Sequence, residues 1–417
     1  MSQSNPESVI PVWVDRPAQL DAAIASLLHE PAYAIDTEFL RERTYYPRLA
    51  LVQIAWPGNT VLIDPLALDL SPLRELLESE SLAVLHAADQ DLEVLEFACG
   101  AVPAKMFDTQ IAAGFLGFSS PSLLTLAERI LSVRLSKGDR LTDWTQRPLT
   151  AAQLSYAASD VLYLLELHQK LLAELENSGR TTWAEAECEL LRVRPRGVAH
   201  ADKAWWKLKD GRALRGKDRL FAQEICKWRE ERARLEDKPV RFVLPDLAVV
   251  SVAQAKPRTF DELSRLRAMD GRYLKGGAGE EILAAVARAV DLPSSALVQP
   301  ESEEFDRKLR PALTLVSAWV AQLAHDAHID PALLATRSDL VHFLRDDGSS
   351  RLAQGWRHHM VGSAIAALVA GDAALAFEAS GMLRLEKRSG VSLGAAVTKP
   401  SASWVLDAPD HRQDDEL

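Results

Sequence analysis

The feature of this sequence that most constrains its fold is a change of hydrophobic pattern about a quarter of the way along the chain. Up to residue 87 the apolar residues form short runs of strand character, and after Asp108 they recur with the spacing of amphipathic helices. The strand-like runs are AYAIDTEF (32–39), LALVQIAW (49–56), TVLID (60–64) and SLAVLHA (81–87). The last run leads into a helical pattern, DQDLEVLEFACG, which ends at Gly100. Strands first, with helices later and between, predict an α/β domain over residues 1–191.

The rest of the chain predicts two helical domains and their connections. Residues 192–212 are basic, contain Pro and Gly and lack periodicity, so we expect a linker there. Amphipathic patterns predict all-α domains over 213–292 and 305–378, separated by a Pro- and Glu-rich break. Both blocks have a long helix, a Pro-marked turn and an Asp-Leu helix start, which indicates a weak internal repeat. The polar tail, 388–417, has no sustained period and is expected to be loosely ordered.

Charge is distributed unevenly along the chain. The net charge of −11 would by itself argue against a nucleic-acid partner. However, residues 1–191 hold 27 acidic and 13 basic side chains, whereas residues 192–241 hold 16 basic and 8 acidic ones. This asymmetry is expected if one part gathers metal ions and the next contacts phosphates. Trp205, Trp206 and Trp228 lie among the basic residues and could stack on bases, although we favour packing in a helical core.

Several classes of protein do not fit this composition. No stretch approaches the ~18–20 consecutive apolar residues of a membrane span, so no membrane partner is expected. The amino terminus lacks the features of a signal peptide, and the final DDEL is then expected to be a chance acidic end. Cys99, Cys188 and Cys226 form no CxxC pair, which argues against a disulfide framework or a zinc site. We expect a cytoplasmic protein. The sequence does not predict an oligomeric state and is compatible with a monomer.

Asp36 and Glu38 stand two residues apart in a run that otherwise reads as a buried strand. Because side chains alternate along a strand, both carboxylates are expected on one face. Burying two carboxylates side by side is costly unless a cation compensates them. The alternative is that both lie at the solvent end of the strand and pair with nearby arginines. Taken alone, the two interpretations are evenly balanced.

Two further groups of polar residues are informative only when they are considered together with this pair. Tyr156 and Asp160 are four residues apart in a helical pattern, which places them on one face. Asp89 and Asp91 lie where the fourth strand enters its helix, a position where acidic residues often only complement the helix dipole. Alone, a surface Asp beside a core Tyr would be the better interpretation of the Tyr156 pair. Together with Asp36 and Glu38, the order Asp-x-Glu, Asp, Tyr-x-x-x-Asp is the DEDDy exonuclease pattern.

This set of residues suits phosphodiester hydrolysis. In-line attack on phosphorus needs an activated water and a stabilised leaving oxygen, which two divalent ions about 3.5–4 Å apart supply. Hard ions such as Mg²⁺ or Mn²⁺ prefer carboxylate oxygens to Cys or His. A tyrosine hydroxyl one helical turn from a carboxylate can orient the attacking water or take its proton. The sequence therefore predicts a two-metal nuclease.

Nearly the whole chain resembles the ribonuclease D family. The resemblance rests on IDTEFLRERTYYPRLALVQIA, LIDPL, HAADQDLEVL, FDTQIAAGFLGF and LTDWTQRPLTAAQLSYAASDVLYL, in that order. The helical block at 213–292 resembles that family's first HRDC domain, through KWREERARLEDKPVRFVL, and the block at 305–378 resembles a degenerate second one. The resemblance implies an exonuclease domain of ribonuclease-H-like fold, with a mixed sheet and flanking helices. It also implies an activity that releases nucleoside 5′-monophosphates from RNA with a free 3′ end. Precursors of transfer RNA and other small structured RNAs are the implied substrates.

The resemblance also implies a role for each residue. Asp36 would bridge two metal ions, Glu38 and Asp160 would bind the ion nearer the attacking water, and Asp91 would hold the second ion, partly through water. Tyr156 would position the attacking water. We reject Asp89, because in the family pattern the acidic residue falls directly before the apolar helical run, here DLEVL.

Other polar residues near these motifs have simpler interpretations. Asp108 matches a recurrent Asp of the family, but FDTQ ahead of a helix favours an N-cap. His86 is expected to be a structural histidine, because the metals in question prefer oxygen. Lys137, Arg140 and Arg147, in the loop before the Tyr156 helix, are candidates to contact the RNA backbone, and solvated surface charge explains them equally well.

Two alternatives stay open at this point. Nothing between Asp36 and Asp160 reads the sugar, so the same centre would also fit a DNA exonuclease. The other is a nucleic-acid-binding adaptor with an inactive nuclease domain. Such a protein would usually lack one of the carboxylates, whereas here all four and Tyr156 are present.

Overall fold

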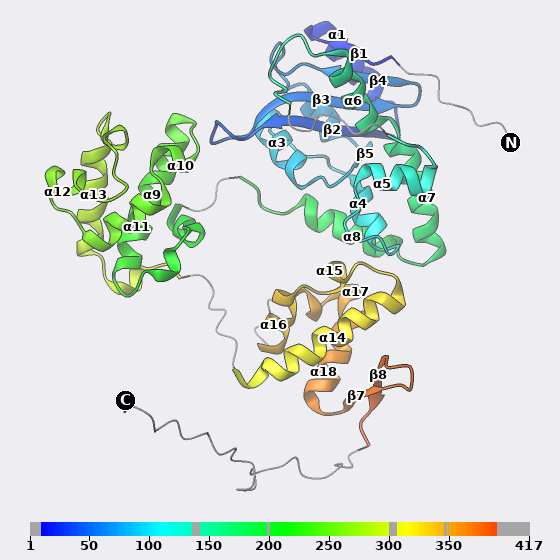
Figure 1. The fold of residues 1–417 in the computed structure, drawn as a ribbon. Coiled ribbons are helices and arrows are strands. Elements are labelled where there is room, and N and C mark those ends of the chain that lie inside the picture. Colours follow the sequence, from blue (N-terminus) through cyan, green and yellow to red (C-terminus); the bar gives the residue numbers. More distant parts are fainter. Residues whose placement is uncertain are drawn as a thin grey trace, which may run out of the picture. The chain divides into compact units, whose positions relative to one another are not determined.

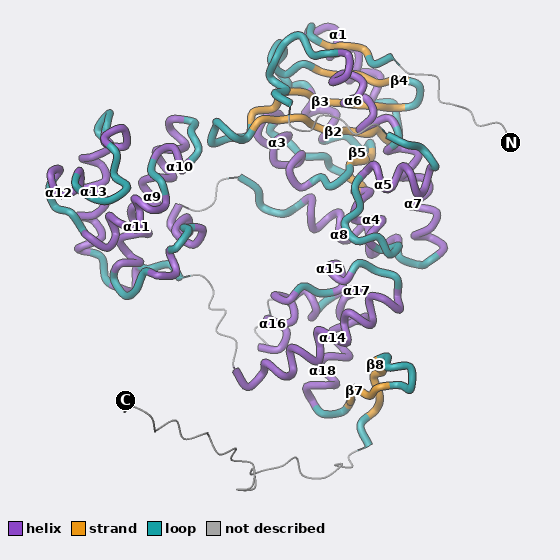
Figure 2. The backbone as a smooth tube through the Cα atoms, viewed as in Figure 1, coloured by secondary structure: helices purple, strands orange, loops and turns teal. Residues whose placement is uncertain are grey.

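The computed structural model describes residues 10–135, 142–197, 201–299, 307–345, 348 and 350–389. The chain divides into two compact units, one of residues 1–308 and 324–334 and the other of residues 309–323 and 335–417. Strands occur in the amino-terminal domain and in one hairpin near the end of the described chain, and the remaining regular elements are helices (Figure 2). Within the described ranges, no helix has the length and apolar character that crossing a bilayer requires.

A six-stranded sheet in the order β1-β4-β3-β2-β5-β6 forms the centre of the amino-terminal domain (Figure 1). Its strands are β1 (Val12–Val14), β2 (Ala32–Leu40), β3 (Arg48–Trp56), β4 (Asn59–Ile63), β5 (Leu82–Leu85) and β6 (Met106–Asp108). β3 is antiparallel to both β2 and β4, and the other neighbouring strands are parallel. The mixed sheet expected from the sequence is confirmed, with β1 and β6 as edge strands that the apolar runs did not predict.

Helices pack against both faces of this sheet. They are α1 (Pro17–Leu27), α2 (Leu73–Leu77), α3 (Asp89–Cys99), α4 (Thr109–Gly114), α5 (Leu123–Leu126), α6 (Ala151–Leu162), α7 (Leu164–Asn177) and α8 (Thr181–Arg192), with a π-helical turn at Ala127–Leu131. One core joins α1, α2 and α3 to strand residues such as Ile35 and Ile54. A second core joins Tyr156 of α6 to Leu51 and Leu62. Because neighbouring strand positions face opposite ways, α3 and α6 lie on opposite faces of the sheet.

The first helical domain includes part of the basic segment, which was expected to be a linker, because Ala204, Trp205 and Leu208 pack in its core. Its helices are α9 (Asp218–Glu236), α10 (Val240–Val243), α11 (Asp246–Ala255), α12 (Phe260–Ser264) and α13 (Ala278–Asp291), with 3₁₀ turns at Ala201–Lys207, Gly211–Ala213, Gly271–Leu274 and Ser294–Ala296. Trp205 and Trp228 are buried in its core, as expected, and their indole N–H groups donate to the Val298 carbonyl and to Glu281. Trp206 is 38% exposed, with the Lys203 ammonium 5.4 Å from its ring centre.

The last described segment is helical and ends in a hairpin. It contains α14 (Arg310–Ala327), α15 (Pro331–Leu334), α16 (Arg337–Arg345), α17 (Gly355–Arg357), α18 (Ser363–Ala370), β7 (Ala373–Phe377) and β8 (Leu383–Lys387), with shorter 3₁₀ or π turns at Arg307–Leu309, Arg351–Ala353 and His358–Gly362. The helical pattern was expected to continue to residue 378, but α18 ends at Ala370 because Gly371 adopts a left-handed conformation with φ 81°. The antiparallel pair β7–β8 follows. Most of the predicted tail, from residue 390, lies outside the described residues.

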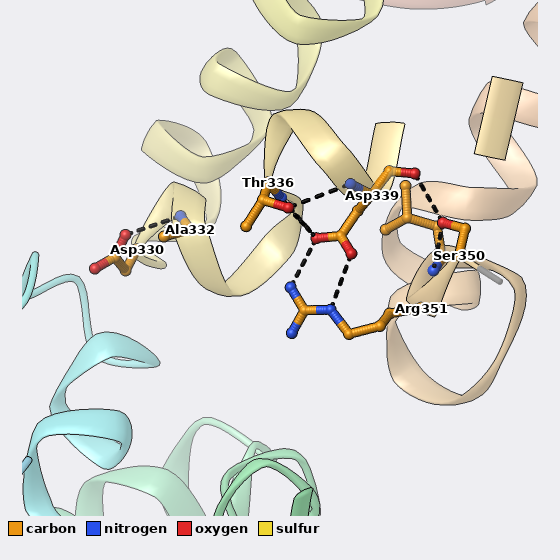
Figure 3. Close-up of polar contacts among 7 residues, drawn as sticks. Asp330, Ala332, Thr336, Asp339, Ser350 and Arg351 are labelled. Atoms are coloured by element: carbon orange, nitrogen blue, oxygen red, sulfur yellow. Dashed lines mark hydrogen bonds and ion pairs between the residues drawn. The ribbon is translucent and has the colours of Figure 1, made fainter. Parts of the chain in front are cut away.

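Asp339 organises the start of α16 (Figure 3). Its carboxylate accepts hydrogen bonds from the backbone N–H and hydroxyl of Thr336, at 2.8 and 2.6 Å, and two from the Arg351 guanidinium, at 3.0 and 2.7 Å. Burial raises the pKa of Asp339, but the donors from Arg351 and Thr336 outweigh it and lower the pKa to about 2. The Asp-Leu helix start noticed in the sequence is therefore a hydrogen-bonded helix cap in this segment.

Candidate active site

Asp36 and Glu38 lie where one edge of β2 becomes accessible. β5 pairs with β2 only over Ala32–Ala34, so the described strands leave this edge of β2 without a partner beyond Ala34. After β5 the chain turns and enters α3 at the same place, which brings the first turn of α3 to the carboxylates of β2. The alternation of side chains places Asp36 and Glu38 on the face covered by α6, and Thr37 on the face covered by α3.

Asp91 is held by β2 through a side-chain hydrogen bond. The Thr37 hydroxyl donates to Asp91 Oδ1 over 2.5 Å, and Asp91 is only 8% exposed. Burial raises the pKa of Asp91 to about 7, although the Thr37 hydroxyl opposes this rise. Asp89 instead has a side chain that is 59% exposed and pairs with Arg194 at 2.9 Å. The structure thus places Asp91, and not Asp89, beside the carboxylates of β2.

Tyr156 and Asp160 come to the same place from the other face of the sheet. Thr150 begins α6 with a capping box, in which its hydroxyl accepts from the Gln153 N–H at 3.2 Å and Gln153 Oε1 accepts from the Thr150 N–H at 2.9 Å. One turn before Asp160, the ring of Tyr156 packs in the core with its centre 6.1 Å from that of Trp144. The core therefore sets where the Tyr156 phenol lies relative to Asp160.

Asp91, Asp160 and Glu38 lie close enough to Asp36 for their charges to act on it. Burial raises the pKa of Asp36 well above its ordinary range, and the charges of Asp91, Asp160 and Glu38 raise it further, while a backbone hydrogen bond from Thr37 lowers it. Among the described residues, no three acidic, histidine or cysteine side chains are arranged so that they could already hold a metal ion together. Like charges repel, so these carboxylates would have to turn toward a cation that binds between them. Their oxygen donors suit Mg²⁺ or Mn²⁺.

Comparison with known proteins identifies the family. Residues 11–176 match the 3′-5′ exonuclease family and residues 219–286 match the HRDC domain. Ribonuclease D of Jannaschia sp. is 38% identical over 367 residues, covering 86% of this chain and 95% of its own length. Ribonuclease D of Escherichia coli is 35% identical over 360 residues, covering 83% of this chain and 96% of its own length. The chain belongs to the ribonuclease D family.

The fold agrees with this assignment. The crystal structure of Escherichia coli RNase D, described as an exoribonuclease involved in structured RNA processing, superposes with a TM-score of 0.78 at 33% identity. The match covers 87% of this chain and 99% of that one. As a ribonuclease D family member the chain is a 3′→5′ exoribonuclease, and its exonuclease family uses divalent metal ions. The expected HRDC domain after the basic linker is confirmed.

Asp108 does more in this ribonuclease D chain than cap a helix. As expected, its Oδ1 accepts from the N–H groups of Gln110 and Ile111 at the start of α4, at 2.8 and 3.3 Å. The carboxylate also accepts from the Ala87 N–H on Oδ1, at 3.1 Å, and from the Ala88 N–H on Oδ2, at 2.8 Å. Ala87 has a φ of 58°, a left-handed conformation that a residue with a Cβ rarely adopts. The buried carboxylate thus also holds the turn from β5 into α3, which carries Asp91.

Arg147, one of the candidate RNA contacts, makes its hydrogen bonds within the protein. Its guanidinium binds Asp64 through two hydrogen bonds, at 2.6 and 2.8 Å, and donates to the carbonyls of Ala50, Trp144 and Gln146. All five of its N–H donors are therefore engaged within the protein. The other two candidate RNA contacts, Lys137 and Arg140, lie outside the described residues.

The remaining polar candidates agree with their simpler interpretations. His86 Nδ1 lies 2.9 Å from the Thr109 hydroxyl, so this histidine joins the end of β5 to the start of α4. Cys99, Cys188 and Cys226 are buried and free. Thr37 gave no sign of its role in the sequence, because a hydroxyl between two acidic residues carries no periodic signal. Its partner is 54 residues away.

Proposed function

We propose that this exoribonuclease hydrolyses the terminal phosphodiester of RNA at a site where Asp36, Glu38, Asp91 and Asp160 hold two divalent cations, Mg²⁺ or Mn²⁺. The observation that carries the proposal is the placement of four carboxylates: the Thr37 hydroxyl holds Asp91 against β2, and Asp91, Asp160 and Glu38 lie close enough to the buried Asp36 for their charges to repel it. Such a cluster is unfavourable without a compensating cation. Two bound cations would supply an activated water and a stabilised leaving oxygen.

Each carboxylate has a position that suits one role. Asp36 is the acidic group that interacts with the other three, so we assign it the bridge between the two ions. Glu38, next along β2, and Asp160, from α6, would bind the ion nearer the attacking water. Asp91 would bind the second ion with the carboxylate oxygen that Thr37 does not occupy.

Tyr156 is assigned to the attacking water. Its ring is fixed by the core beside Trp144, one helical turn from Asp160. A phenol held there can orient the water, and its phenolate form can accept the water's proton as the water oxygen bonds to phosphorus. The P–O3′ bond then breaks, the shortened RNA keeps a 3′ hydroxyl, and the last nucleotide leaves as a nucleoside 5′-monophosphate.

We propose that the substrates are structured RNAs with a free 3′ end, and that precursors of transfer RNA are the main class. The Escherichia coli relative, an exoribonuclease involved in structured RNA processing, supports this proposal. Residues 192–241, which overlap the start of the HRDC domain, also support it because their basic side chains outnumber the acidic ones. Electrostatic attraction to the phosphate backbone is the general source of affinity in such segments. A hairpin RNA with a 3′ extension should be shortened one nucleotide at a time up to its stem.

The mechanism is tested by comparing the wild type with Asp36→Asn and Asp160→Asn on matched RNA and DNA oligonucleotides, with Mn²⁺ or EDTA. We expect metal-dependent release of nucleoside 5′-monophosphates from RNA by the wild type, and none by either variant, although both should still bind RNA. Equal, metal-independent background in all three proteins would favour the adaptor. Faster hydrolysis of DNA than of RNA would favour the DNA exonuclease.

A further inference from the structure

The side-chain amide of Gln53, in the middle of β3, has no hydrogen-bond partner among the described residues. The side chain is 0% exposed, and neither its amide nitrogen nor its amide oxygen bonds to any group in the described part of the chain. An amide offers two donors and an acceptor with two lone pairs, and burying them without partners is unfavourable. Native proteins satisfy most buried polar side chains, so an orphaned one calls for a specific explanation.

The surroundings of Gln53 make its polarity more notable. In the run LALVQIAW, residues 49–56, it is the only polar residue. Its neighbours on the same face of β3 are Leu51, which belongs to the core under α6, and Ala55. An apolar side chain would therefore match the rest of this strand. Packing alone gives no reason for an amide here.

The strand register places Gln53 directly opposite Asp36. The two residues are paired in the antiparallel ladder between β2 and β3, ahead of the irregularity that falls between Glu38 and Phe39. Directly opposite residues project to the same face, with Cβ atoms about 4.5–5.5 Å apart. The amide of Gln53 is thus the polar group across the ladder from the carboxylate that interacts with the other three.

We propose that Gln53 is a positioning residue for Asp36. Its amide donates a hydrogen bond to the Asp36 carboxylate, directly or through one buried water, when the carboxylate turns toward metal. Asp36 needs such a donor because three neighbouring carboxylates repel it, and a backbone hydrogen bond from Thr37 is the stabilising contribution already in place. Hydrogen-bond donors behind metal-binding carboxylates commonly fix their orientation. This inference rests on the proposed metal site.

Thr60 provides a matched control. Its hydroxyl is also buried without a partner in the described chain, and the residue is 2% exposed. In the ladder between β3 and β4, however, Thr60 pairs with Ala55 and not with an acidic residue. Replacing Thr60 with Val removes a buried orphaned polar group from the same sheet without affecting Asp36.

The test measures Mn²⁺ binding to the full chain by calorimetry, together with the melting temperature in EDTA. The proteins are wild type, Gln53→Met, Gln53→Leu, Thr60→Val and Asp36→Asn. We expect both Gln53 variants to melt at or above the wild-type temperature, because an orphaned polar group is gone. Their Mn²⁺ affinity should fall by about 10- to 100-fold. Thr60→Val should keep wild-type affinity.

The outcomes separate this inference from the proposed function. If either Gln53 variant folds and binds Mn²⁺ with wild-type affinity, Gln53 does not position Asp36. An equal loss of affinity in Thr60→Val would also overturn the inference, because the effect would then be a general one of the sheet. If Asp36→Asn binds Mn²⁺ as tightly as the wild type, the metal site itself is misassigned and the proposed mechanism fails with it.

Discussion

The Thr37 hydroxyl lies 2.5 Å from Asp91 Oδ1 and joins β2 to α3 within the acidic cluster. This bond occupies one oxygen of Asp91 and leaves the other for a metal ion. It also explains why a threonine stands between the two acidic residues of β2: its side chain projects to the face of α3 while theirs project to the face of α6.

Replacing Thr37 with Val should weaken metal binding and slow hydrolysis together. The valine keeps the shape of the side chain but leaves Asp91 without its donor, and losing a partner that orients a metal ligand typically costs 10- to 100-fold, about what we expect here. Thr37→Ser keeps the hydroxyl and should restore most of the activity. Mn²⁺ titration of RNA hydrolysis measures both effects. Equal activity of the Val and Ser variants would show that the hydroxyl is not needed.

Replacing Tyr156 with Phe should slow the chemical step and spare metal binding. The phenol is expected to position the attacking water, and a positioned proton acceptor contributes about 10²–10⁴-fold to rate. The ring still fills its place beside Trp144, so the melting temperature should change little. Single-turnover hydrolysis of RNA at saturating Mn²⁺ measures the step. Undiminished turnover would remove Tyr156 from this role.

Asp91 should make the stability of the metal-free protein depend on pH. Its pKa is raised from an ordinary value of 3.8 to about 7, so between these values the folded protein binds a proton that the unfolded chain has released. The contribution of Asp91 to stability is therefore present below about pH 4 and is lost as the pH rises through about 7. Melting temperatures in EDTA, measured from pH 5 to pH 8 for the wild type and Asp91→Asn, isolate this contribution.

We expect Asp91→Asn to gain stability relative to the wild type as the pH rises over that range, because the neutral amide avoids a buried charge. Added Mn²⁺ should reverse the order at pH 8, because only the ionised carboxylate binds metal well. A difference between the two proteins that stays constant with pH would mean that the pKa of Asp91 is not raised.

Replacing Asp108 with Asn should destabilise the amino-terminal domain. The carboxylate accepts from four backbone N–H groups, and the amide of Asn would point its own N–H groups at some of these donors. Hydrogen bonds to a charged group each contribute about 1.5–3 kcal/mol, so urea unfolding should show a loss of at least this size. Asp69→Asn removes an exposed carboxylate that, within the described chain, accepts only from Ser71, and it should leave the unfolding midpoint unchanged.

The sequence predicted the parts of this site that follow from periodicity. Asp36 and Glu38 share a face because strands alternate, and Tyr156 and Asp160 stack because helices repeat every 3.6 residues. The mixed sheet and the first HRDC domain followed from the same patterns and from the family resemblance. The choice of Asp91 over Asp89 needed the resemblance, since both lie in the first turn of α3.

Other features depend on tertiary pairing, which periodicity does not report. The orphaned amide of Gln53 matters only because the register sets it opposite Asp36. Arg147 lies in a polar loop, where its sequence is also compatible with a surface charge. In the structure it donates a hydrogen bond to Asp64, 83 residues away, which no local pattern reports. β1 is three residues long and is stabilised by its parallel pairing with β4, so its own sequence carries little signal. The Ala-rich sequence of β7 was predicted to continue a helix. In the structure Gly371 ends α18, and the residues after it form a strand.

The proposed mechanism requires two cations bound among four carboxylates. Anomalous diffraction from crystals of the full chain soaked in Mn²⁺ tests this directly. We predict two peaks about 3.5–4 Å apart between Asp36, Glu38, Asp91 and Asp160, and the loss of both in Asp36→Asn crystals. Mn²⁺ peaks elsewhere with none among these four side chains would contradict the account.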